Sequence, residues 1–148
     1  MAKPTLLSGI QPTGRLHIGN YLGALKNFVD LQNSGKYRGL FAVVDLHSMT
    51  EDYDPKAKPA QILDIAADFL AAGLDPKKSV IFQQSHIPAH TELTWMLSTV
   101  TPMGDLSRMT QFKDKAEMQK EVNAGLFFYP ILMAADILLY SPKYVPVG

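Results

Sequence analysis

The segment from Gly9 to Asn20 concentrates residues that could bind a phosphate. It reads Gly-Ile-Gln-Pro-Thr-Gly-Arg-Leu-His-Ile-Gly-Asn. Gly14 and Gly19 would let a ligand approach the backbone, and the free N–H groups at a helix N-terminus favour anions. His17 adds a side-chain donor. The alternative is a glycine-rich turn with a partly exposed histidine, because phosphate-loop patterns have many false positives, and the segment has neither a Walker ending nor a G-x-G-x-x-G motif.

A second candidate site lies on a long apolar segment near the C-terminus. Asp136 is the only charged residue from Leu126 to Tyr140. Tyr129, Met133, Asp136 and Tyr140 share one face of a helix at this spacing. A carboxylate there is costly unless it is solvated or paired, so Asp136 is either structural or the acceptor in a ligand pocket. A flat ligand with one N–H donor, such as an indole, would suit a single acceptor on such an apolar face.

The other histidines carry weaker signals. His47 follows a predicted strand, where ligand-facing residues lie, although a lone histidine is more often structural. His86 and His90 are four residues apart, but Pro88 lies between them and no third ligand follows, so we expect no metal site. A locally basic segment, of a kind that is usually a solvated face, contains Arg108, Lys113, Lys115 and Lys120.

The pattern of apolar residues predicts the elements that would position these side chains. Buried strands are predicted at Thr5–Ile10, Gly39–Leu46 and Ser79–Gln83, with a fourth beginning at Tyr144–Val147. Helices are predicted at Leu16–Asn33, Pro59–Ala72 with Gly73 as its cap, Pro88–Leu97 and Pro130–Tyr140, and an irregular or short-helical stretch at Gly104–Lys120. This alternation favours an α/β fold with a parallel sheet, in which ligands bind at the carboxyl ends of the strands.

Composition excludes several classes of protein. The chain has 148 residues with 14 basic and 14 acidic side chains, so its formal net charge is zero and a general nucleic-acid or membrane-surface binder is disfavoured. It has no cysteine, which rules out disulfides and thiolate chemistry. We find no secretory signal and no apolar run of about 18 residues, and we therefore expect a cytoplasmic protein.

The motifs together resemble those of the bacterial tryptophanyl-tRNA synthetases. His17-Ile18-Gly19-Asn20 is similar to the H-I-G-H signature of class I aminoacyl-tRNA synthetases, with Asn in place of the final His. The similarity covers essentially the whole chain, in blocks at residues 8–24, 43–47, 109–113 and 129–140. The fold that it implies is the Rossmann-like parallel sheet with flanking helices of that superfamily.

The resemblance also implies a set of site residues. ATP would bind at Gln11, Pro12, Thr13, Gly19 and Asn20, and the catalytic residues would be His17, Asn20 and Lys115. His17 would face the phosphates as a donor that favours the transition state, and Lys115 would reach the triphosphate. Asp136 would read the indole N–H, and the rest of the tryptophan site would be Leu7, Val44, His47, Tyr129, Met133, Val145 and Val147. A phenol carries its donor elsewhere on the ring, so this geometry can reject tyrosine.

The implied activity is that of a tryptophan–tRNA ligase. Such an enzyme activates L-tryptophan with ATP and Mg²⁺, the metal arriving with ATP rather than at a protein site, and transfers the tryptophanyl group to tRNA(Trp). The resemblance ends at Gly148, before the family's Lys-Met-Ser-Lys-Ser loop and anticodon-binding domain. We therefore expect a C-terminally truncated catalytic domain from a homodimer, impaired in catalysis by itself. The alternatives are a tyrosyl-tRNA synthetase or other H-I-G-H nucleotidyltransferase, and a non-catalytic nucleotide-binding or dimerisation module.

Overall fold

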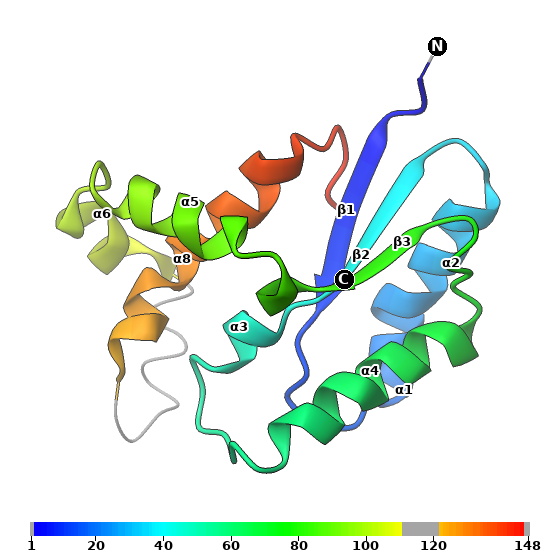
Figure 1. Ribbon diagram of the computed structural model, residues 1–148, viewed down its shortest axis with the longest axis horizontal. Helices are drawn as coiled ribbons and strands as arrows, with labels where there is room; N and C mark the ends of the chain where they lie inside the picture. The colour runs from blue at the N-terminus through cyan, green and yellow to red at the C-terminus, as the bar shows by residue number, and fades with distance from the viewer. Residues whose placement is uncertain (1, 111–121, 147–148) are drawn as a thin grey trace.

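The computed structural model describes residues 2–110 and 122–146 as a parallel sheet with helices on both faces (Figure 1). Strands β1 (Thr5–Ile10), β2 (Arg38–Val43) and β3 (Val80–Gln83) follow one another in the sheet in that order. The helices are α1 (Ile18–Asn20), η1 (Tyr21–Leu25), α2 (Lys26–Asn33), α3 (Asp45–Ser48), α4 (Lys58–Ala72), η2 (Gln84–His86), α5 (Ala89–Ser98), α6 (Met103–Arg108) and α8 (Ala124–Tyr140). The predicted fold class, a Rossmann-like α/β sheet, is confirmed. Within the described ranges, no helix is long and apolar enough to cross a membrane.

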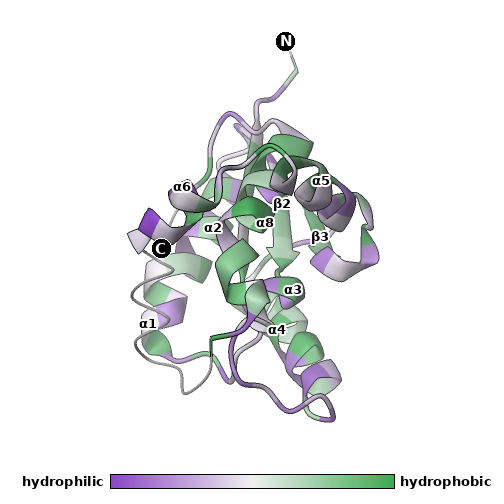
Figure 2. Ribbon diagram, turned by 90° about the vertical axis from the view of Figure 1, so that its left-hand side faces the viewer, coloured by the Kyte–Doolittle hydropathy of each residue, from purple (hydrophilic) through white to green (hydrophobic). Residues whose placement is uncertain are grey.

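The main hydrophobic core lies between the sheet and the pair α2 and α4. Every residue of β2 after Arg38 is buried, which is typical of a parallel strand covered on both faces. Phe41 of β2 is fully buried and stacks on Phe28 of α2, with ring centroids 5.0 Å apart, and Phe69 of α4 meets the edge of Phe28. Figure 2 shows apolar residues gathered on the strands and on α8 in the middle of the molecule. This packing anchors the first strand-to-helix junction.

The other face of the sheet is covered by α5 and α8, which pack against each other (Figure 1). The chain leaves α8 at Ser141, whose backbone is left-handed (φ 42°), and returns beside β1. There the backbone N–H of Leu7 donates to the carbonyl of Tyr144 at 3.1 Å, and the hydroxyl of Ser8 donates to that of Pro146 at 2.9 Å. The predicted fourth strand is thus a single parallel bridge between Leu6 and Tyr144 in the described residues. Val147 and Gly148 lie outside them.

Three predicted boundaries are wrong for local reasons. The last helix begins at Ala124 rather than Pro130, because the side chain of Asn123 caps it by accepting from the backbone N–H of Leu126 at 2.9 Å. The second strand ends at Val43 rather than Leu46, because Asp45 opens the short helix α3. The first helix begins at residue 18 rather than 16, because residue 17 is its N-cap. The helix α4 has a proline in its first turn and ends at Gly73 (φ 110°), as predicted.

Candidate functional site

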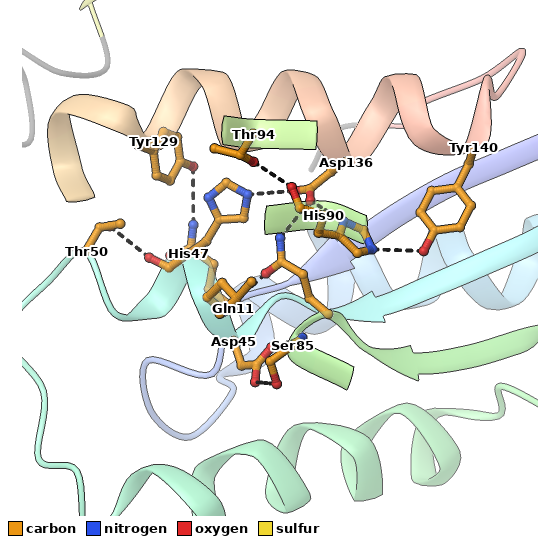
Figure 3. Close-up of polar contacts among 12 residues, drawn as sticks. Gln11, Asp45, His47, Thr50, Ser85, His90, Thr94, Tyr129, Asp136 and Tyr140 are labelled. Carbon is orange, nitrogen blue, oxygen red and sulfur yellow. Dashed lines mark hydrogen bonds and ion pairs between the residues drawn. The ribbon is translucent and has the colours of Figure 1, made fainter. Parts of the chain in front are cut away.

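A cavity of about 360 Å³ lies between the sheet and α8. The strands contribute mostly small or apolar side chains to it, and its polar side chains come from α3, α5, α8 and the loop after β1 (Figure 3). The structure brings together in its wall every described residue that was assigned to a tryptophan site: Leu7, Val44, His47, Tyr129, Met133, Asp136 and Val145. The last residue assigned to that site, Val147, lies outside the described part of the chain. The cavity is therefore a mostly apolar chamber with one carboxylate in its wall.

Donors from three other elements converge on the carboxylate of Asp136. Nε2 of His47, from α3, lies 2.7 Å from Oδ2. Nδ1 of His90, from α5, lies 2.6 Å from Oδ1, and the amide of Gln84, from η2, donates to the same oxygen at 2.8 Å. These contacts join residues 46 to 89 positions apart in the sequence, so only the tertiary structure can create the cluster.

The hydrogen bonds keep Asp136 ionised in spite of its burial. Desolvation is the largest single influence and raises the pKa of this carboxyl group. The hydrogen bonds from His47, His90 and Gln84, together with the charge of His47, outweigh it, and the pKa lies below its ordinary value of 3.8. An ionised carboxylate only accepts hydrogen bonds, so both histidine nitrogens that face it must carry protons. The carboxylate of Asp136 is therefore paired, and it also forms part of the cavity wall.

One ring nitrogen of His47 has no hydrogen-bond partner among the described residues. That nitrogen is Nδ1, which is buried, whereas Nε2 is bound to Asp136. The ring meets that of Tyr129 edge-on, with centroids 4.6 Å apart. An orphaned buried polar atom beside a cavity is one of the features that mark a ligand site.

Sequence reasoning missed three members of this cluster as site residues. Gln84 is fully buried and His90 is 1% exposed, and Tyr140 completes the set with its hydroxyl 2.8 Å from Nε2 of His90. The sequence pattern offers His90 only as a metal ligand beside His86. Their positions in the sequence could have indicated two of them. Gln84 follows the carboxyl end of β3, and Tyr140 lies one helical turn beyond Asp136.

The junction after β1 has a different organisation, built on a helix cap. Nδ1 of His17 accepts from the backbone N–H of Gly19 at 3.1 Å, and the backbone N–H of His17 donates to Oδ1 of Asn20 at 3.0 Å. A Cβ at Gly19 would lie 2.8 Å from Cε1 of His17, so only glycine leaves room for this ring. His17 is exposed, and so is Thr13, whereas Pro12 is buried. The junction thus presents a capped helix start at the carboxyl edge of the sheet.

Two side chains tie this junction to its surroundings. The amide of Gln11 donates to the hydroxyl of Tyr129 at 3.2 Å, which joins the junction to the cavity (Figure 3). On the other side, the ammonium group of Lys58 donates to the carbonyl of Pro12 at 3.0 Å. Lys58 is 8% exposed, and burial lowers its pKa while the charges of Glu51 and Asp45 oppose that shift. Sequence reasoning did not single out Lys58, because a lysine at the start of a surface helix carries no special signal.

Two further expectations concern a metal site at His86 and His90 and the basic segment that contains Arg108 and Lys115. His86 is exposed and His90 is committed to Asp136, and no group of three potential metal ligands occurs among the described residues. Lys115, assigned to the triphosphate, lies outside the described residues, as do Lys113 and Lys120. Arg108 is exposed at the end of α6, where it pairs with Asp105.

Comparison with known proteins gives consistent matches. The family model for class I tRNA synthetases (W and Y) matches residues 1–148. A curated relative from Caldanaerobacter subterraneus subsp. tengcongensis, "Tryptophan--tRNA ligase", is 54% identical over 97% of this chain and 43% of its own length. The structure of tryptophanyl-tRNA synthetase from Mycoplasma pneumoniae superposes with a TM-score of 0.93 at 40% identity, covering 99% of this chain and 44% of that one. The enzyme from Campylobacter jejuni, solved with ADP and tryptophan, gives 0.91 at 45% identity, covering 97% and 44%.

Proposed function

The chain belongs to the family of class I tRNA synthetases for tryptophan and tyrosine, and from this premise we propose that it is the N-terminal part of the catalytic domain of a tryptophan–tRNA ligase. It spans less than half the length of the curated relative and of the two solved structures that it matches. The whole protein would activate L-tryptophan with ATP to form tryptophanyl-adenylate and would transfer the tryptophanyl group to tRNA(Trp). The residues described here would supply the tryptophan pocket and one side of the ATP site.

The observation that carries the proposal is the number of hydrogen bonds on Asp136. A carboxylate has about four acceptor positions, two on each oxygen. Oδ1 accepts from His90 and Gln84, and Oδ2 accepts from His47, so one position remains on Oδ2. One open position on a carboxylate in the wall of a mostly apolar cavity matches an indole, which has one N–H donor and a flat apolar body.

The junction after β1 is suited to ATP by its donors. The family resemblance assigns ATP to Gln11, Pro12, Thr13, Gly19 and Asn20, and these lie on the loop and first turn at the carboxyl edge of the sheet. The neutral His17 ring accepts through Nδ1, which places its proton on the exposed Nε2 as a donor for phosphate oxygens. These residues bring N–H groups and no carboxylate, so they suit phosphate rather than a metal ion. Mg²⁺ would enter with the nucleotide as part of the substrate.

The hydrogen bond between Gln11 and Tyr129 supports placing the two substrates side by side. Adenylate formation requires the tryptophan carboxylate to attack the α-phosphate, so the amino-acid pocket and the nucleotide loop must adjoin. A direct link between the nucleotide loop and the wall of the cavity holds them in that relation. In adenylate formation, the residues of this chain would position the two reactants and stabilise charge on the phosphate.

The remaining parts of the proposal concern assembly and location. We propose a cytoplasmic homodimer that engages the acceptor end of tRNA(Trp). Support for a subunit interface comes from a set of large apolar side chains that are exposed in the single chain: Trp95, Met96, Val100, Met103 and Phe128. Both the relative and the solved structures named above are tryptophan enzymes, which favours tryptophan over tyrosine as the amino acid.

Calorimetric titration with L-tryptophan and L-tyrosine tests the proposal. We expect the chain to bind tryptophan and to reject tyrosine. We also expect Asp136→Asn to weaken tryptophan binding by about 100-fold or more, because His90 and Gln84 hold the amide oxygen and the NH2 donor then replaces Oδ2. Asp64→Asn, a change at an exposed carboxylate of α4, is the matched control and should bind as the wild type does. Equal binding of both amino acids, or unchanged tryptophan affinity in Asp136→Asn, would contradict the assignment.

A further inference from the structure

We infer that His90, anchored by Tyr140, is a specificity-determining positioning residue, which fixes Asp136 so that its carboxylate offers one acceptor to an indole N–H. The inference rests on the proposed tryptophan site and assigns a role in it to two residues outside the expected set. Neither would need to touch the amino acid. They would act through Asp136.

The geometry of His90 commits both of its ring nitrogens. Nδ1 lies 2.6 Å from Oδ1 of Asp136, and Nε2 lies 2.8 Å from the hydroxyl of Tyr140 (Figure 3). The residue is 1% exposed, and its ring lies nearly parallel to that of Phe82, with centroids 6.2 Å apart. His90 belongs to α5, whereas both of its hydrogen-bond partners belong to α8. The ring therefore forms a fixed bridge between the two helices.

The proton on His90 has a defined position in this arrangement. Asp136 is ionised and can only accept, so Nδ1 carries a proton. In the neutral ring Nε2 is then an acceptor, and the hydroxyl of Tyr140 donates to it. Asp136 thereby sets the tautomer, and Tyr140 holds the ring in place from its other side. The arrangement parallels the way in which a second hydrogen bond orients a histidine at metal and catalytic sites.

Filling Oδ1 leaves only Oδ2 to select a ligand. His90 and Gln84 fill both acceptor positions of Oδ1, and their hydrogen bonds fix the plane of the carboxylate. Oδ2 then keeps one position, set by the direction that His47 leaves free. Loss of His90 would free a position on Oδ1 and leave Gln84 and His47 to hold the carboxylate, which would be less tightly fixed about χ2, a torsion that is broad for Asp. The open position on Oδ2 would then accept a hydrogen bond from water as readily as from an indole.

The test compares two ligands that differ only at the recognised atom. L-tryptophan and β-(3-benzothienyl)-L-alanine have nearly the same shape, but the second carries sulfur in place of the indole N–H. The dissociation constants of both are measured for the wild-type chain, His90→Leu, His90→Asn, Tyr140→Phe and His86→Leu. His86 is an exposed histidine four residues before His90 and is the matched control.

We expect the wild type to prefer tryptophan by more than tenfold, and His90→Leu to lose most of that preference by weakening tryptophan alone. His90→Asn keeps an N–H near the position of Nδ1 and should retain more of the preference, Tyr140→Phe should lose part of it, and His86→Leu should keep it in full. Equal weakening of both ligands in His90→Leu and Tyr140→Phe would indicate a merely structural role and would overturn the inference. So would an unchanged preference in both variants.

A second measurement needs no ligand and separates this inference from the proposed function. Nitrogen-15 NMR of the free wild-type chain should show His90 protonated at Nδ1, and Tyr140→Phe should shift its Nε2 resonance, whether or not His90→Leu folds. A ring protonated only at Nε2 would overturn the inference while leaving tryptophan binding untouched. A wild-type chain with the expected tautomer that does not bind tryptophan would instead overturn the proposed function, and the assigned role with it.

Discussion

The backbone N–H of Gly19 donates a hydrogen bond to Nδ1 of His17, 3.1 Å away. The same histidine therefore caps a helix through Nδ1, and the proton of the neutral ring lies on Nε2. The structural interpretation of this segment, a turn with an exposed histidine, and the functional interpretation, a phosphate donor, are thus compatible. Each uses a different nitrogen of one ring.

Replacing His17 with Asn separates these two roles. Asn is among the preferred N-cap residues, and its oxygen can accept from Gly19 as Nδ1 does, so we expect the free energy of unfolding to stay within about 0.5 kcal/mol of the wild type. The Nε2 donor is lost, and tryptophan-dependent pyrophosphate exchange should fall by about 100-fold with little change in KM for ATP. The rate is measured in a complete ligase in which this chain replaces the matching region of a curated relative. A proportional rise in KM with unchanged kcat would show that His17 serves binding alone.

Lys58 should support ATP binding by holding the loop after β1 in place, although we do not assign Lys58 itself to the ATP site. Its ammonium group donates to the carbonyl of Pro12 at 3.0 Å, and Lys58→Met keeps the aliphatic stem but removes that hydrogen bond. One such bond contributes about 0.5–1.5 kcal/mol, so KM for ATP should rise by roughly three- to tenfold in the same exchange assay. Lys56→Met removes an exposed lysine two residues earlier and should have no effect. Equal behaviour of the two variants would refute a role for Lys58.

The ion cluster around Asp136 predicts how stability changes with pH. Its pKa is below the ordinary value of 3.8 in the folded chain, so the unfolded chain binds a proton there more readily. The stabilisation is fully present above that ordinary value and is lost as the pH falls through the lower, folded pKa. Urea unfolding between about pH 5 and pH 3 should show a steeper loss of stability in the wild type than in Asp136→Asn. Asp64→Asn should keep the wild-type slope, and a wild-type slope in Asp136→Asn would contradict the predicted shift.

Two glycines should respond oppositely to alanine. A Cβ at Gly9 of β1 would lie 2.7 Å from the backbone oxygen of Ala42, which cannot move without disturbing β2, so Gly9→Ala should lower the free energy of unfolding by about 1–3 kcal/mol. A Cβ at Gly23, in the helical segment η1, meets nothing within 4 Å. Gly23→Ala should raise the free energy of unfolding by up to about 1 kcal/mol through helix propensity. Urea midpoints compare the variants, and a Gly9→Ala chain as stable as the wild type would disprove the close approach of the two strands.

The boundaries that the sequence placed well are those governed by local chemistry. The left-handed residue Gly73 ends α4, and the hydrophobic pattern alone locates β1 at Thr5–Ile10. The misplaced start of α8 has a different origin. Proline is common in a first helical turn, which favoured Pro130, but the side chain of Asn123 supplies a cap seven residues earlier. The buried face of α8 then carries Pro130 inside the helix.

The residues around the cavity likewise divide into those that local sequence could group and those that it could not. Met133 and Asp136 could be placed on one face of one helix, because helical periodicity is a local property. Gln84 and His90 could not be joined to them, because hydrogen bonds between residues 52 and 46 positions apart leave no periodic trace in a single sequence. His90 was therefore considered beside His86, its neighbour in sequence, rather than beside its partner in space.

By itself, the sequence determined the three strands, the parallel α/β class, the turn after the first strand and the apolar helix with one carboxylate, since each depends on residues within a few turns or one strand. Only the tertiary structure decided that Asp136 is ionised and paired, and that Oδ2 retains the one open acceptor position. The physical reason is that the protonation and hydrogen bonding of a buried carboxylate are set by the donors packed around it. Here those donors come from α3, η2 and α5, which meet only when the sheet and its helices have assembled.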